Sequence, residues 1–182
     1  YRMHSLAALA LVASLYHCLN HALFKSLLFL GTGSVLHATQ ERNLGKLGGL
    51  IHRMPWVAWL ALVGTLAAAG IPPLNGFVSE WLLLQAFLFT PSLPQSFVNM
   101  LVPLAAAALV LAAALAAYVM VKFYGVIFLG QPREPNFAKA HVAGGCGRVA
   151  VGYIASGSVL AVVLTTAVIE LSAAQLVTGA SR

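Results

Sequence analysis

The sequence predicts an all-α protein, a polytopic transmembrane helix bundle of about four spans, and three observations support this. Hydrophobic residues make up 60% of the 182 residues and charged residues only 8%, whereas a soluble domain carries about 25% charged residues. Mean hydropathy is +0.90. Apolar runs longer than the ~20 residues that a helix needs to cross a bilayer cover 6–36, 56–88, 98–129 and 149–177.

The first run begins near Leu6 and ends at about His37, where a polar segment follows. The connection at 38–55 is rich in glycine and in basic residues. We expect this connection to lie at the membrane interface as a short helix.

The second run starts after Pro55, with Trp56 and Trp59 as anchors at the membrane interface. Pro72 and Pro73 interrupt it, because proline lacks the backbone donor that a helix needs. A break of this kind is tolerated in lipid only where protein or water satisfies the freed carbonyl groups. The sequence therefore predicts a Pro-broken helix, with the break at 70–76.

The third run is rich in alanine, which suits close helix packing, and it ends near Gly130. The uncharged connection at 90–97 precedes it and the basic connection at 131–148 follows it. Basic loops stay cytoplasmic, so 38–55 and 131–148 are predicted on the cytoplasmic side and 90–97 outside. The basic residues of the two cytoplasmic connections are Arg42, Lys46, Arg53, Arg133, Lys139 and Arg148.

The formal net charge of +6 is explained by this topology, because the basic residues are divided between two connections and do not form one face. We expect no nucleic-acid partner. Cys18 and Cys146 lie far apart without CxxC spacing. We expect no metal, no cofactor and no catalytic residue in this chain.

Glu80 is the acid that lies deep within an apolar run, shortly after the predicted break. A carboxylate at membrane depth costs about 2.5 kcal/mol or more, so it persists where it faces a cavity, a partner or an ion path. Two interpretations follow from the sequence. Glu80 either moves ions or forms a structural hydrogen bond with the broken backbone.

His17, His21 and Lys25 recur at i, i+4 and i+8, so that each lies about 40° from the next on a helix. Histidine titrates near neutrality and burial shifts the pKa of lysine, so this stripe could pass protons. The alternatives are hydrogen bonding between helices and a histidine metal site, for which no third ligand is in register. Lys122, near the end of its run, either joins the relay or reaches out to the interface.

Four motifs along the chain are specific. The most specific is HCLNHALFKSLLFLGTGSVLH at 17–37. The others are NLGKLGGL at 43–50, IPPLNGFVSEW at 71–81 and FLGQPR at 128–133. Together they resemble one family of membrane proteins, the antiporter-like subunits shared by respiratory complex I, Mrp cation/proton antiporters and membrane-bound hydrogenases. The IPPLNGFVSEW motif is most similar to the hydrogenase branch, of the hydrogenase-4 component B or formate hydrogenlyase type.

The resemblance implies a C-terminal part of a proton-translocating subunit built from inverted helix repeats. Residues 1–135 would be the second-half part of its proton-conducting domain, and 136–182 a poorly matched loop with a last transmembrane helix. Lys25 and Glu80 would carry protons in the second half-channel, with His17 and His21 as relay candidates.

The same resemblance implies a location in the bacterial inner (plasma) membrane. The partners would be membrane lipid, other membrane subunits and a peripheral redox arm. The chain would have no active site of its own and would serve an oxidoreductase complex of hydrogenase or NADH:quinone type. Two alternatives stay open: an Mrp-type sodium or potassium/proton antiporter subunit, and a non-conducting structural membrane anchor.

Overall fold

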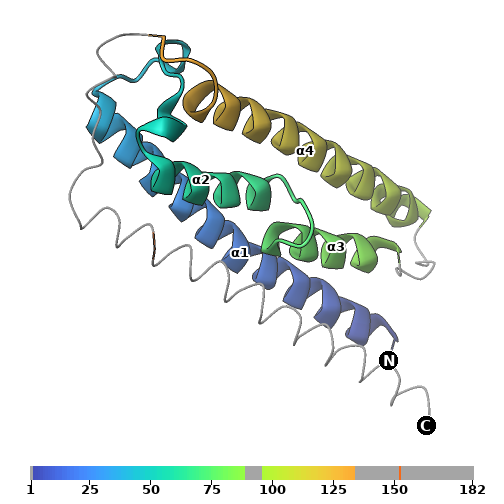
Figure 1. Ribbon diagram of the computed structural model, residues 1–182. Coiled ribbons are helices and arrows are strands. Elements are labelled where there is room, and N and C mark those ends of the chain that lie inside the picture. Colours follow the sequence, from blue (N-terminus) through green and yellow to red (C-terminus); the bar gives the residue numbers. More distant parts are fainter. Residues whose placement is uncertain (1, 89–95, 134–151, 153–182) are drawn as a thin grey trace.

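A computed structural model describes residues 2–88, 96–133 and 152 of the chain, and the part it describes contains helices and no strand. This confirms the predicted all-α class. Figure 1 shows that α2 and α3 follow one another along the length of the long helix α1, with α4 on their other side. The helices are α1 (Arg2–Thr39), α2 (Pro55–Ala68), α3 (Asn75–Leu88) and α4 (Ser96–Phe128).

Two of these helices are long and apolar enough to cross a membrane, namely α1 over Ala7–Thr39 and the whole of α4. The helices α2 and α3 have 14 residues each. At 1.5 Å per residue each covers roughly 21 Å, less than the ~30 Å of a hydrocarbon core. The second predicted run is therefore one broken span. The fourth predicted run, 149–177, lies outside the described residues except for residue 152.

The break occupies residues 69–74, close to the predicted 70–76. Gly70 adopts a left-handed conformation with φ of 63°. Its N–H donates to the carbonyl of Ala67 at 3.2 Å, and the N–H of Ile71 donates to that of Leu66 at 3.2 Å. These bonds form a Schellman motif, which satisfies the last carbonyl groups of a helix. Pro72 follows at once and prevents α2 from continuing.

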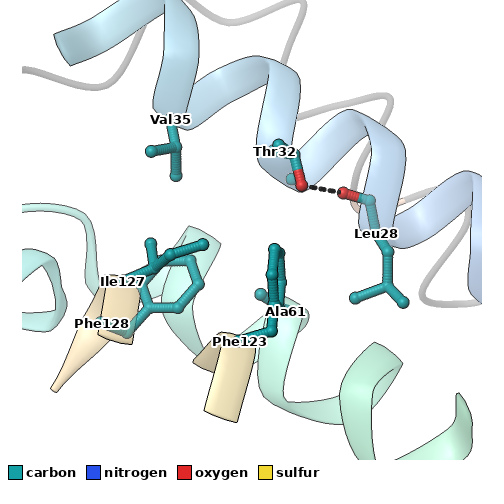
Figure 2. Close-up of a pocket in the computed structure, with 8 residues that line it drawn as sticks. Leu28, Thr32, Val35, Ala61, Phe123, Ile127 and Phe128 are labelled. Carbon is teal, nitrogen blue, oxygen red and sulfur yellow. Dashed lines mark hydrogen bonds between the residues drawn. The ribbon is translucent and has the colours of Figure 1, made fainter. Parts of the chain in front are cut away.

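The apolar core lies where α1, α2 and the end of α4 meet. Figure 2 shows Leu28, Thr32 and Val35 of α1 opposite Phe123 and other side chains of α4. The Thr32 hydroxyl donates to the carbonyl of Leu28 at 2.8 Å, within its own helix. Apolar side chains line the rest of this pocket. Its remaining members are Gly31, Ala61, Ile127 and Phe128.

The short helix predicted for connection 38–55 is wrong in form, because the structure has two separate 3₁₀ turns, Leu44–Lys46 and Leu50–His52. Gly48 and Gly49 lie between them, and Gly49 has a left-handed φ of 66° that ends any continuous helix. The N–H of Gly49 donates to the carbonyl of Leu129 at 3.0 Å. This bond fastens the connection to the end of α4.

Charged groups stabilise the same connection. Arg133 donates from Nη1 to the carbonyl of Gly45 at 2.8 Å. The Lys46 ammonium lies 3.2 Å from Glu41 Oε2. The pKa of the Glu41 carboxyl lies below its ordinary value. The largest cause is the hydrogen bond from the backbone N–H of Asn43, and the second is the hydrogen bond from the Lys46 ammonium. Hydrogen bonds and charge thus join the residues after α1 to those after α4.

Candidate functional site

His17, in the polar stripe of α1, meets α3 through a hydrogen bond between side chains. His17 Nδ1 lies 2.9 Å from Ser79 Oγ. Ser79 is fully buried, and its Oγ also lies 2.9 Å from the carbonyl oxygen of Gly76, to which it donates. His17 is half-buried. The structure therefore places one predicted relay residue directly against the second half of the broken span.

A second pair of side chains joins the same two helices. Asn20 and Asn75 are both buried, with exposures of 0% and 1%. The Asn75 side-chain amide donates to Asn20 Oδ1 at 3.2 Å, and the Asn20 amide donates to the backbone carbonyl of Asn75 at 3.3 Å. Since Asn75 is the first residue of α3, this pair fixes where the second half of the span begins against α1.

Glu80 follows Ser79 on α3 and is half-buried. Its carboxylate packs on the backbone of Gly70, because a Cβ built on Gly70 would lie 2.5 Å from Glu80 Oε2. In the part of the chain that the structure describes, Glu80 has neither a hydrogen bond nor an ion pair. The structure thus gives no support to the alternative in which Glu80 hydrogen bonds to the broken backbone.

The remaining predicted residues are arranged less closely. The rings of His17 and His21 are neighbours, with centroids 6.1 Å apart, and the His21 ring meets the Phe24 ring edge-on at 5.1 Å. Lys25 is half-buried, and within the described residues no ion pair joins it to Glu80. In the described part of the chain, no third His, Cys, Asp or Glu joins the histidines as a metal ligand.

Lys122 and the two prolines lie at the periphery of this arrangement. Lys122 is exposed on α4, and within the described residues no hydrogen bond or ion pair joins it to the α1 stripe. Pro72 and Pro73 are exposed in the break. They shape the backbone around the site and contribute no donor to it.

Ser79 and Asn75 are site residues that were not predicted from the sequence. Both are polar, and they lie four residues apart, on one face of α3 in an otherwise apolar run. That spacing is the signal that would have found them, since polar side chains repeated on one face of a membrane helix point to a partner helix.

The fold and the site together define a class of protein. It is a helical membrane protein in which a broken span meets a polar, ionisable stripe of a neighbouring helix, an arrangement typical of transport proteins. Comparison with known proteins identifies the family. The family model described as NADH:quinone oxidoreductase/Mrp antiporter, transmembrane, matches residues 2–101. The chain belongs to this family, which confirms the resemblance inferred from its motifs.

Hydrogenase subunits are among its relatives. Over 140 residues the chain is 49% identical to formate hydrogenlyase subunit 3 of Escherichia coli K12, covering 76% of this chain and 23% of that protein. It is 40% identical over 135 residues to hydrogenase-4 component B of the same organism, covering 74% of this chain and 20% of that protein. The chain therefore spans less than a quarter of the length of either relative.

Antiporter subunits are similar as well. The chain is 35% identical over 133 residues to Na(+)/H(+) antiporter subunit A1 of Staphylococcus saprophyticus, covering 71% of this chain and 16% of that protein. A solved structure of the Mrp complex from Dietzia sp. superposes with a TM-score of 0.67 at 22% identity, covering 88% of this chain and 36% of the matched chain. At that identity the match establishes a shared fold.

Proposed function

We propose that this chain is part of a proton-translocating membrane subunit of a hydrogenase or NADH:quinone-type oxidoreductase complex. The observation that carries the proposal is the hydrogen bond between His17 and Ser79. It connects the ionisable stripe of α1 to α3, at the residue that precedes Glu80. Ionisable groups gathered inside a membrane bundle are typical of proton relays.

In this proposal Lys25, His21 and His17 exchange protons along α1, and Glu80 is the titratable group on α3. Among the described residues, Lys25 and Glu80 form no ion pair with each other. The charge on one still changes the free energy of protonating the other, because opposite charges in a medium of low dielectric interact over several ångströms. That coupling would let a change at one end of the relay drive proton release at the other.

We further propose that the chain is a multi-pass protein of the bacterial inner membrane, where it contacts lipid, other membrane subunits and a peripheral redox arm. The redox reaction would occur in the partners, and this chain would move charge. The higher identity to formate hydrogenlyase subunit 3, 49% against 35% for the antiporter subunit, favours the hydrogenase type over the sodium or potassium antiporter type.

Lys25→Met in the full-length subunit tests this function. The change removes an ammonium group and keeps an apolar side chain of similar length. We expect proton translocation per assembled complex to fall on the order of tenfold or more, as for loss of a proton-transfer group. Lys46→Met is the control, because Lys46 lies in the connection between α1 and α2, where it forms an ion pair with Glu41, and we expect it to pump normally.

The anchor hypothesis makes the opposite prediction for Lys25→Met. Under it, the amount of assembled complex would fall and translocation by the complexes that do assemble would stay at the wild-type level. Proton uptake into vesicles, divided by the amount of complex measured in the same vesicles, separates the two. Wild-type translocation by assembled Lys25→Met would remove Lys25 from the mechanism.

The predicted topology has its own test. With Cys18 and Cys146 replaced by serine, a cysteine introduced at Gln40 should react with an impermeant thiol reagent from the cytoplasmic side, and one at Ser92 from the outside. Gln40 is exposed just after α1, so it should label readily. Labelling of both positions from one side would contradict the topology inferred from the basic connections.

A further inference from the structure

We propose that Ser79 is a positioning residue that holds the neutral imidazole of His17 as the Nδ1–H tautomer and leaves Nε2 to take up the proton. The inference rests on the proposed function. It adds which ring nitrogen of one relay residue, His17, takes up the proton. Three contacts of the described residues carry it: His17 with Ser79, Ser79 with Gly76, and Asn20 with Asn75.

The Ser79 hydroxyl has one proton and two hydrogen-bonding neighbours. A serine hydroxyl has one proton to donate and lone pairs to accept with. Ser79 Oγ lies 2.9 Å from two groups, the carbonyl oxygen of Gly76 and His17 Nδ1. A carbonyl oxygen can only accept. The hydroxyl proton therefore lies between Ser79 and Gly76, since two oxygens at hydrogen-bond distance repel each other when no proton lies between them.

The position of the Ser79 proton decides which ring nitrogen of His17 carries a hydrogen. Once Ser79 gives its proton to Gly76, its Oγ can only accept from the ring. His17 Nδ1 must then carry a hydrogen. In a neutral imidazole one nitrogen donates and the other accepts, so Nε2 of His17 is the unprotonated nitrogen. A proton that reaches His17 from the relay is taken up at Nε2, on the side of the ring away from Ser79.

The contact between His17 and Ser79 is rigid. Ser79 is fully buried, so water does not compete for its hydroxyl. Asn20 and Asn75 form a second link between the same helices, three residues after His17 on α1 and four residues before Ser79 on α3. Two links one turn apart fix both the spacing and the register of α1 and α3. The ring of His17 is held with Nδ1 against Ser79, and this contact favours the Nδ1–H tautomer.

The experiment uses the full-length subunit in its assembled complex, with ¹⁵N-labelled histidine, in membranes. Solid-state NMR distinguishes protonated from unprotonated ring nitrogens, and the His17 signals are assigned by their loss in His17→Gln. We expect Nδ1–H in the wild type. Ser79→Ala should convert His17 wholly or partly to the Nε2–H form and reduce translocation per complex on the order of tenfold. Ser79→Thr keeps the hydroxyl and should restore both.

Ser34→Ala is the matched control, because the Ser34 hydroxyl donates to the carbonyl of Leu30 in its own helix and, among the described residues, forms no hydrogen bond with a histidine. It should change neither the spectrum nor translocation. An Nε2–H form in the wild type, or an unchanged spectrum in Ser79→Ala, would overturn the inference. Wild-type translocation by Lys25→Met would instead overturn the proposed function, and the tautomer would still be read from the spectrum.

Discussion

Glu80→Gln is expected to reduce proton translocation per assembled complex on the order of tenfold or more while the complex still assembles. Glutamine keeps the shape of the side chain and its capacity for hydrogen bonds, but it has no titratable proton. Assembly should survive because Glu80 makes no hydrogen bond or ion pair among the described residues. The substitution also removes the cost of an acid at membrane depth, about 2.5 kcal/mol or more.

Two further variants sharpen this result. Glu80→Asp retains the acid and shortens its reach, so part of the activity should remain. Glu41→Gln removes an acid that lies outside the spans, next to Lys46, and should leave translocation unchanged. The measurement is proton uptake into vesicles, divided by the amount of complex. Full activity in Glu80→Gln would show that this carboxylate takes no part in proton transfer.

Gly76→Ala is expected to prevent stable assembly of the subunit. Gly76 is buried in the first turn of α3, and a Cβ at this position would overlap the carbonyl group of Ala67. The obstacle is backbone, which cannot rotate away as a side chain can. Overpacking usually costs about 1–3 kcal/mol and sometimes more. Here relief requires α3 to move from the end of α2, which would also separate Ser79 from His17.

Gly33→Ala is the control for this effect, since a Cβ on Gly33 meets no atom within 4 Å. Alanine favours a helix over glycine by about 1 kcal/mol, so this variant should assemble as well as the wild type. The readout is the yield of intact complex and its midpoint of thermal denaturation. Normal assembly of Gly76→Ala would mean that α2 and α3 do not meet as closely as the structure shows.

Much of the fold could be predicted from the sequence because its signals are local. Gly70 and Pro72 are residue types that interrupt a helix whatever the surrounding fold. The spacing of His17, His21 and Lys25 places these three residues on one face of any helix. The single helix expected after α1 was wrong because Gly49 has a left-handed φ, which suits its contact with the end of α4.

The contacts of the site were less accessible to sequence reasoning. Whether His17 meets Ser79 or another residue of α3 depends on how far α1 and the broken span are displaced along each other. That displacement is set by packing of apolar side chains from three helices and by the Asn20–Asn75 pair. The same geometry decides that Glu80 lies against Gly70 and forms no ion pair with Lys25. The site roles of these residues remain predictions for the variants above.

The two halves of the broken span are attached to the rest of the bundle by different kinds of contact, and this has a mechanical consequence. Along α2 the contacts are largely dispersion and hydrophobic burial, which change smoothly when surfaces slide. The start of α3 is held to α1 by directional hydrogen bonds, which are either made or broken. If the same force acted on both helices, α2 would therefore shift gradually against the bundle. The start of α3 would move in discrete steps, as its hydrogen bonds to α1 broke and re-formed. Residues 69–74 would be the joint between the two helices.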